Sequence, residues 1–192
     1  MSELRQERRR PRSDGIRSRE AILAAAMALL CRRADVTVDE IASAAGVSRQ
    51  TAYVHYPSRE TLLRAVNDRL GTEAAAVLDP VEAMTGPVTE ILARWLEGIW
   101  ELVGRYPLLL SPALASLPAC EQKPLTSRCF ELLERGRHAG EIDSRTPTSW
   151  MVLVIMSLGY AAAQQVASRE LTADEAGHLF RDSALRVCLP GR

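Results

Sequence analysis

The stretch from Thr37 to Tyr56, TVDEIASAAGVSRQTAYVHY, constrains the fold of this chain more than any other. Thr37 and Glu40 have the spacing of a capping box, which satisfies the free backbone N–H groups where a helix begins. Apolar residues then recur at three- and four-residue intervals and mark one buried face. Gly46 ends this helix, because glycine reaches the left-handed backbone conformation without steric cost. Ser48 is a typical N-cap, so a second helix follows. The stretch predicts a helix-turn-helix.

The second helix of this motif has an inner and an outer side. At 100° per residue, the inner stripe holds Ala52 and Tyr56, and the outer side holds Arg49, Gln50, Tyr53 and Val54. A short helix, a glycine turn and a second helix that starts with polar residues can read the major groove of DNA. Arginine pairs bidentately with guanine and glutamine with adenine, so Arg49 and Gln50 are the predicted base contacts. Thr51 is a further candidate, for a thymine methyl or a phosphate. The alternative is a capped helix pair with a purely structural role.

From Thr37 to about Leu70 the chain resembles the DNA-binding domain of the tetracycline-repressor (TetR) family of bacterial transcription regulators. The resemblance rests on Ala-Gly-Val-Ser at 45–48, Tyr53, His55-Tyr56 and Ser58-Arg59-Glu60. It implies phosphate contacts by Thr37, Tyr53, His55 and Arg59, the last at a position where the family more often has lysine. Ala52 and residues 30–35 depart from the family pattern, but these departures concern packing. The predicted DNA-binding residues are Thr37, Ser48, Arg49, Gln50, Thr51, Tyr53, His55 and Arg59.

Helical periodicity continues to the end of the chain without a strand pattern, so we expect an all-α fold. A first helix from Arg17 to Cys31, with an apolar stripe that includes Ile16 and Leu30, is expected to cover the helix-turn-helix. Ser58 caps a fourth helix, which Asp79-Pro80 terminates near Val77. Further helices are expected at 88–105, 108–117, 121–137, 148–167 and 172–187. We divide the chain into a flexible Arg-rich arm (1–15), a DNA-binding domain with the helix-turn-helix (16–57), a connecting helix (58–78) and a larger helical domain for ligand binding and dimerisation (79–192).

The distribution of charge supports a nucleic-acid partner. The chain has no net charge, yet residues 1–70 hold 13 arginines and nine acidic residues, so their net charge is +4 and that of the remainder is −4. A polyanion is attracted to the basic end, where the helix-turn-helix lies. Residues 1–15 carry five arginines and almost nothing apolar, which predicts an arm that is disordered when free and adds DNA contacts. The alternative is a tail that only adds solubility.

Other functional classes find little support. The four cysteines form no CxxC pair and no histidine stands at zinc-ligand spacing, so we expect free thiols in a reducing cytoplasm and no metal or cofactor. No nucleophile elbow, phosphate loop or HExxH motif occurs, so we expect no enzyme. We expect no secretory signal, and the apolar centre of the 148–167 helix, residues 150–163, is too short for a membrane span.

The larger domain contains more aromatic and sulfur-bearing side chains than DNA binding requires. These could line a pocket for a small apolar or aromatic effector of unknown identity, with plain core as the alternative. The candidate lining residues are Leu92, Trp95, Trp100, Phe130, Trp150 and Met151. The resemblance implies a repressor that a ligand releases from double-stranded operator DNA, and a homodimer formed by the last two helices. Gly159 and Ala162 would then permit close approach of the partner. The alternatives are an effector-independent architectural DNA-binding protein and, more remotely, a cryptic enzyme.

Overall fold

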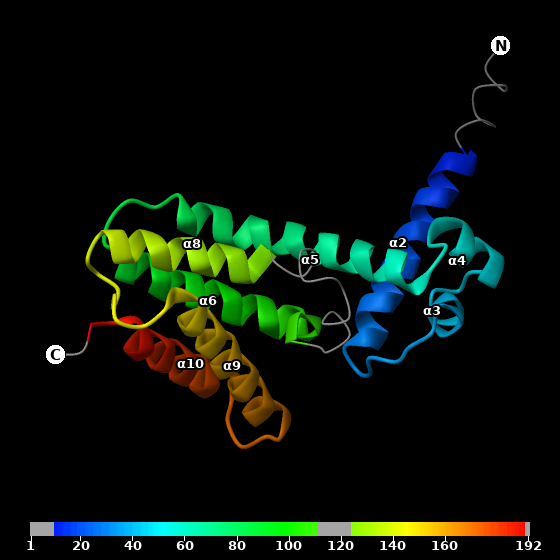
Figure 1. The fold of residues 1–192 in the computed structure, drawn as a ribbon. Coiled ribbons are helices and arrows are strands. Elements are labelled where there is room, and N and C mark those ends of the chain that lie inside the picture. Colours follow the sequence, from blue (N-terminus) through cyan, green and yellow to red (C-terminus); the bar gives the residue numbers. More distant parts are fainter. Residues whose placement is uncertain (1–9, 111–123, 191–192) are drawn as a thin grey trace, which may run out of the picture. The chain divides into compact units, whose positions relative to one another are not determined.

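The computed structural model describes residues 10–110 and 124–190 (Figure 1). Within these two ranges every regular element is helical, which confirms the predicted all-α class. The chain divides into two compact units between Arg69 and Leu70, inside one long helix. The elements are α2 (Arg10–Leu30), α3 (Val38–Ala44), α4 (Arg49–His55), α5 (Arg59–Glu82), α6 (Val88–Arg105), the 3-10 helix η1 (Pro107–Leu110), α8 (Pro124–His138), α9 (Thr148–Ala167) and α10 (Ala173–Cys188).

The first unit packs α2, α3, α4 and the first half of α5 around a small apolar core. Its buried residues lie at three- and four-residue intervals along each helix, as the sequence pattern predicts. They include Ile22, Ala26, Leu30, Ile41, Ala52, Tyr56, Leu62 and Val66. Because α3 and α4 are both seven residues long, they depend on tertiary contacts, which they make with each other and with α2.

The start of α2 differs from the sequence prediction. Residues 10–15, expected in a flexible arm, are helical, while residues 1–9 of that arm lie outside the described residues. Asp14 and Arg17 form an ion pair of 3.4 Å one turn apart on this extension. Ile16, expected in the buried stripe, is 66% exposed, and the first fully buried residue of α2 is Ile22. The apolar contact of α2 therefore begins near Ile22.

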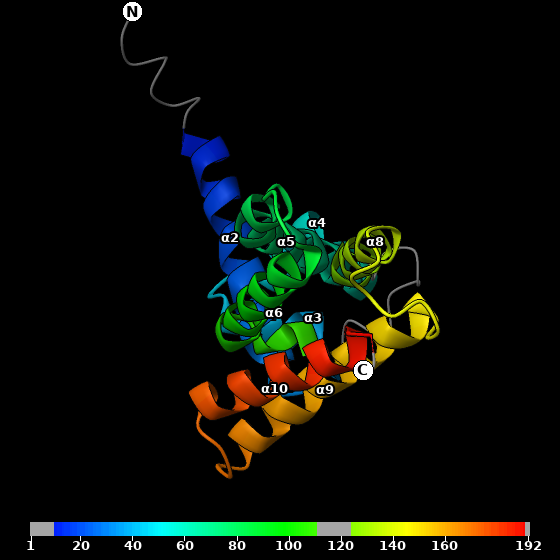
Figure 2. The same cartoon turned by 90° about the vertical axis from the view of Figure 1, so that its left-hand side faces the viewer.

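The second unit is arranged around α6. Figure 2 shows α6 and α8 on one side of the antiparallel pair α9 and α10. Nine residues of α6 are buried, and the helix packs against both α8 and α10. The second half of α5 also contributes to this core through Ala74 and Leu78. Gly98 permits the close approach of α6 to α5, since a Cβ at this position would lie 3.0 Å from a methyl group of Val77.

The helix α5 continues through Pro80, where the sequence predicted its end. It reaches Glu82, because polar contacts with two other helices hold the last turn in place. The indole N–H of the fully buried Trp95 donates to Glu82 Oε1 at 2.9 Å. Arg128 donates to the same oxygen at 2.8 Å and to Asp79 Oδ1 at 2.6 Å. These contacts offset the single backbone hydrogen bond that proline removes from the helix.

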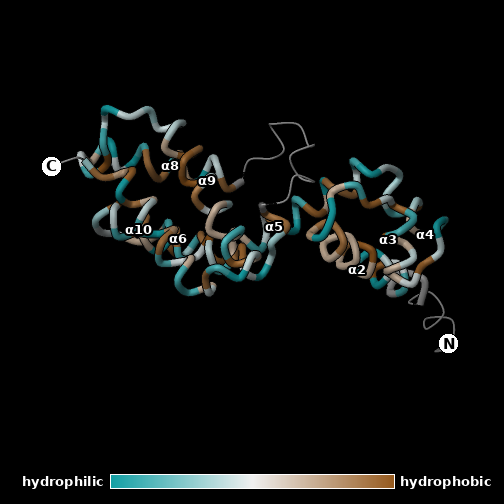
Figure 3. Tube along the Cα trace, turned by 90° about the horizontal axis from the view of Figure 1, so that it is seen from below, coloured by the Kyte–Doolittle hydropathy of each residue, from teal (hydrophilic) through white to brown (hydrophobic). Residues whose placement is uncertain are grey.

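The helix α9 contains no charged residue and is strongly apolar, and brown stretches mark its trace in Figure 3. Among the described residues it alone is long and apolar enough to cross a membrane, by length and composition only. Only 22% of the most apolar 18-residue stretch of α9 is buried within the chain. The buried side, with Met151, Ile155 and Gly159, packs on the core, and a Cβ on Gly159 would meet Phe180 of α10 at 3.4 Å. Gly159 and Ala162 therefore face the interior of the same chain, in contrast to their predicted role toward a partner.

The contact between α6 and α10 depends on Gly177. A Cβ at this position would lie 2.6 Å from two atoms of the Trp100 ring, whose N–H donates to the Ala173 carbonyl at 2.9 Å. We expect Gly177→Ala to lower the free energy of unfolding by roughly 1–3 kcal/mol, because a rigid ring cannot yield without losing this hydrogen bond. Gly104→Ala, where a Cβ meets nothing within 4 Å, should be neutral or stabilising by up to about 1 kcal/mol. Urea unfolding at equal protein concentration compares the two, and equal effects would contradict the prediction.

Candidate nucleic-acid interface

The start of α3 has the predicted capping box. The backbone N–H of Thr37 donates to Glu40 Oε2 at 2.8 Å, and the N–H of Glu40 donates to Thr37 Oγ1 at 3.3 Å. The Thr37 hydroxyl also donates to Glu40 Oε2 at 2.8 Å. The hydrogen bonds from Thr37, with a smaller contribution from Arg33, hold the pKa of Glu40 below its ordinary value of 4.5. The cap is thus complete near neutral pH and weakens as acid protonates this carboxylate.

The turn between α3 and α4 has the backbone conformation that the sequence predicts. Gly46 has φ +67°, which disfavours residues that carry a Cβ, although a Cβ would meet nothing within 4 Å. The N–H of Gly46 donates to the Ser43 carbonyl and that of Val47 to the Ala42 carbonyl, both at 3.1 Å. Ser48 Oγ then accepts from the N–H of Thr51 at 3.1 Å and caps α4. The predicted helix-turn-helix is therefore present.

The two sides of α4 are oriented as the helical periodicity predicts. Ala52 is fully buried and Tyr56 is 2% exposed, so they anchor α4 to the core of the first unit. The exposed residues are Arg49, Gln50, Tyr53 and Val54. Thr51 is half-buried, and its hydroxyl shares a 2.8 Å hydrogen bond with Ser48 Oγ within the cap. Arg49 and Gln50 thus have the exposure that base contacts require, and Thr51 has less.

Arg49 is held on the outer face by two neighbours. Its Nε lies 3.0 Å from Asp39 Oδ1 on α3, and its guanidinium carbon lies 5.6 Å from the centre of the Tyr53 ring. The side chain of Arg49 remains 71% exposed, so the ion pair is solvated and weak on its own. Asp39 was not predicted as a site residue, because no spacing rule joins the second residue of α3 to the first of α4. Its contact with Arg49 arises only when the turn brings the two helix starts together.

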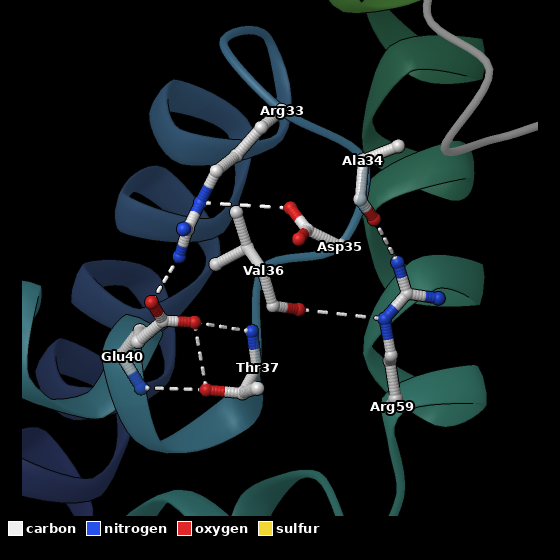
Figure 4. Close-up of polar contacts among 7 residues, drawn as sticks. All are labelled: Arg33, Ala34, Asp35, Val36, Thr37, Glu40 and Arg59. Carbon is white, nitrogen blue, oxygen red and sulfur yellow. Dashed lines mark hydrogen bonds and ion pairs between the residues drawn. The ribbon is translucent and has the colours of Figure 1, made fainter.

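The remaining predicted phosphate contacts have different surroundings. His55 is half-buried, and a Cβ on Gly15 of α2 would come within 4.0 Å of its ring. Arg59, at the first turn of α5, donates from Nη2 to the Ala34 carbonyl and from Nε to the Val36 carbonyl at 3.4 Å (Figure 4). The guanidinium of Arg59 thus binds the loop between α2 and α3. Contact of these residues with phosphate stays a prediction.

The six residues predicted to bind a ligand do not gather in one site. Leu92, Trp95 and Met151 are buried in the continuous core of the second unit, and Trp100 packs on Gly177. Phe130 is 41% exposed and Trp150 is 57% exposed, because each lies on the outer side of its helix. Of the six, Phe130 alone is among the residues that line a groove of about 420 Å³ between α8 and α9. The groove is lined by Thr126, Ser127, Phe130, Glu131, Ser149 and Val152.

The part of the chain that the structure describes contains no cluster of three or more residues suited to a metal ion. Burial raises the pKa of the Cys129 thiol to about 12, with a smaller contribution from Cys188. Burial likewise raises the pKa of Cys188 to about 11, so both are unreactive thiols near neutral pH. Cys31 is exposed, and Cys120 lies outside the described residues. The two buried cysteines, Cys129 and Cys188, thus give no sign of a nucleophile.

Comparison of the sequence with known proteins identifies relatives of the first unit. Residues 22–66 match the family of bacterial regulatory proteins called tetR. The transcriptional repressor LfrR of Mycolicibacterium smegmatis is 37% identical over 86 residues, which are 45% of this chain and 46% of that protein. The transcriptional regulator EthR of Mycobacterium tuberculosis is 40% identical over 94 residues, 48% of this chain and 43% of that protein. The chain thus matches about half the length of these relatives.

Solved structures extend the similarity over both units. The crystal structure of LfrR from Mycolicibacterium smegmatis, named Mycobacterium smegmatis there, in complex with proflavine has a TM-score of 0.63 at 26% identity, covering 91% of this chain and 98% of that one. A bacterial regulatory protein of the tetR family from Rhodococcus RHA1 has a TM-score of 0.74 at 18% identity, covering 91% and 98%, and shows the shared fold. The capped helix-turn-helix thus lies within the segment that matches the tetR family of bacterial regulatory proteins, and over both units the chain is similar to the solved structure of LfrR.

Proposed function

We propose that this chain is a transcriptional regulator that binds double-stranded operator DNA through α4. The observation that carries the proposal is the exposure of Arg49 and Gln50 at the start of a helix whose opposite side is buried. Arginine and glutamine present forked donors and acceptors that match guanine and adenine in the major groove. The net charge of +4 on residues 1–70 favours approach to phosphates.

The contacts of Arg49 favour a role in base reading. Asp39 holds its Nε and the Tyr53 ring lies beside its guanidinium carbon, which limits the rotamers that the side chain explores. A side chain that is already ordered loses less entropy when it binds a base edge. The Nη atoms, which the ion pair with Asp39 does not use, can pair with guanine O6 and N7.

We expect Arg49→Ala to cost roughly 1–3 kcal/mol of operator affinity and to relax base preference at one position in each half-site. The physical reason is the loss of a bidentate pair that only one base edge satisfies. Selection of duplexes from a random-sequence library, followed by fluorescence anisotropy, measures both effects. Arg94→Ala on the exposed side of α6 is the matched control and should change neither. Unchanged affinity and preference in Arg49→Ala would remove this residue from the interface.

We also propose that the chain acts as a two-fold dimer through α9 and α10. Large apolar side chains on these helices are exposed in the single chain: Trp150 and Leu153 by 57% each, Leu179 by 55% and Tyr160 by 49%. Trp150, Leu153 and Tyr160 lie on one stripe of α9, at intervals of three and seven residues. An apolar patch of this kind marks an interaction surface, and a second copy covers it symmetrically. Two-fold symmetry fits a near-palindromic operator.

We expect Leu153→Glu to yield monomers, because a charge at this position would lose its water in the dimer interface. Sedimentation velocity at micromolar concentration distinguishes the two states. Val54→Glu, on α4, places the same charge at a residue that is 73% exposed and should leave the dimer intact. Wild-type chain that sediments as a monomer would refute the dimer, and dimeric Leu153→Glu would place the interface elsewhere.

We further propose that a small planar aromatic cation binds the groove between α8 and α9 and lowers DNA affinity. The groove offers the Phe130 ring, the Glu131 carboxylate and three hydroxyl-bearing residues. A carboxylate beside an aromatic ring is suited to a flat cation. Proflavine, the compound in the LfrR crystal structure, is a molecule of this class and serves as the probe.

We expect Glu131→Gln and Phe130→Ala each to weaken proflavine binding roughly 3- to 10-fold, through loss of the ion pair or of ring stacking. Calorimetry without DNA measures this affinity, and Glu101→Gln on α6 is the charge-matched control. Equal affinity in all variants would exclude the groove. Proflavine that binds the wild-type chain yet leaves operator affinity unchanged would favour a regulator that needs no effector.

A further inference from the structure

The side chain of Arg59 on α5 binds the loop between α2 and α3. Arg59 donates from Nη2 to the Ala34 carbonyl and from Nε to the Val36 carbonyl, 23 to 25 residues earlier in the chain (Figure 4). Nε and Nη2 form one edge of the planar guanidinium, so a single rigid group spans two carbonyls of the loop. The contact is partly buried, which reduces competition from water.

On its other side, the same loop is bound to α3 by an ion pair. Arg33 pairs with the Glu40 carboxylate and lies 3.7 Å from Asp35 Oδ1. Glu40 in turn accepts hydrogen bonds from the N–H and the hydroxyl of Thr37. Figure 4 shows these groups on one side of the loop backbone and Arg59 on the other. Between them Val36 is 1% exposed, so its side chain anchors the loop in the core.

These contacts together determine the position of Thr37. The Val36 carbonyl that Arg59 binds belongs to the peptide whose N–H is that of Thr37, and this N–H donates to Glu40. Displacement of that peptide would therefore break the capping box and shift the start of α3. Because α3 packs on α4, such a shift would also move the helix that carries Arg49.

We infer that Arg59 is a positioning residue for DNA binding: its guanidinium holds the α2–α3 loop, and thereby Thr37 and the start of α3, in the binding geometry. The inference rests on the proposed DNA-binding function. It differs from the direct phosphate contact that the resemblance implies, because two of the three guanidinium nitrogens, Nε and Nη2, already donate to loop carbonyls. Lysine, with a single ammonium on a flexible stem, keeps the charge but does not reproduce this pair of donors.

The charge-conserving variant Arg59→Lys separates the two roles. We expect it to weaken binding about 5- to 20-fold, the equivalent of one or two lost hydrogen bonds, to a duplex that the wild-type chain has selected from a random library. The dependence of affinity on salt between 50 and 200 mM should stay unchanged, because no phosphate contact is lost. Arg64→Lys, on the exposed side of the same helix, is the matched control and should bind within twofold of the wild type. Wild-type affinity in Arg59→Lys would overturn the inference, since lysine serves equally well as a simple phosphate contact.

A second measurement needs no DNA. Trypsin cleaves after Arg32 and Arg33 when the loop opens, so mass spectrometry of the early fragments reports how firmly the loop is held. We expect faster cleavage at these two sites in Arg59→Lys than in Arg64→Lys, and equal rates would overturn the inference. If Arg59→Lys does not fold, as judged by circular dichroism, Glu40→Gln keeps the capping box but loses the ion pair with Arg33, and it should show the faster cleavage. A Glu40→Gln chain that is cleaved like the wild type would overturn the inference as well.

The two measurements also distinguish this inference from the proposed function. A wild-type chain that selects no duplex would refute DNA binding, whatever the cleavage rates are. A wild-type chain that selects a duplex while Arg59→Lys binds and is cleaved like Arg64→Lys would refute only the role of Arg59.

Discussion

The candidate interface depends on the stability of two seven-residue helices, which are too short to persist in water by themselves. Each begins with backbone N–H groups that have no partner inside the helix. The capping box of Thr37 and Glu40 satisfies some of these groups in α3, and the Ser48 side chain satisfies one in α4. Ala52 and Tyr56 anchor α4 to the core. The exposed residues of α4 can therefore vary in chemistry without loss of the fold, which is what a DNA-reading surface requires.

The second unit uses its aromatic bulk for packing. Trp95 is fully buried, yet its polar N–H is satisfied by Glu82, which Arg128 also binds. This arrangement joins the end of α5, α6 and α8 through one carboxylate. A buried indole without such an acceptor would lose a hydrogen bond to water, so the position of Glu82 is coupled to that of Trp95. Any displacement of α5 in this unit would have to preserve or replace these contacts.

The outer side of α9 presents the opposite situation. Its buried side is complete within one chain, since Gly159 and Ala162 lie against the core and Phe180. Trp150, Leu153 and Tyr160 have no such cover in the described part of the chain and are about half exposed. The membrane-like composition of this helix reflects two apolar sides, one buried in the core and one exposed, and the exposed side is the one that we propose binds a second copy. The small residues bring α9 and α10 of the same chain together, and the large ones lie on the exposed side.

The sequence by itself determined the local features: the helical class, the capping box at Thr37, the left-handed turn at Gly46 and the two sides of α4. Each depends on residues within about one or two helical turns, where capping and periodicity act. Tertiary structure decided what depends on distant partners. The continuation of α5 past Pro80, the burial of Trp95 and Met151, the exposure of Phe130 and the contact of Arg59 with residues 34 and 36 arise there. Periodicity shows that a helix has a buried side, but neither the element that covers it nor the partner of a long polar side chain is encoded in local spacing.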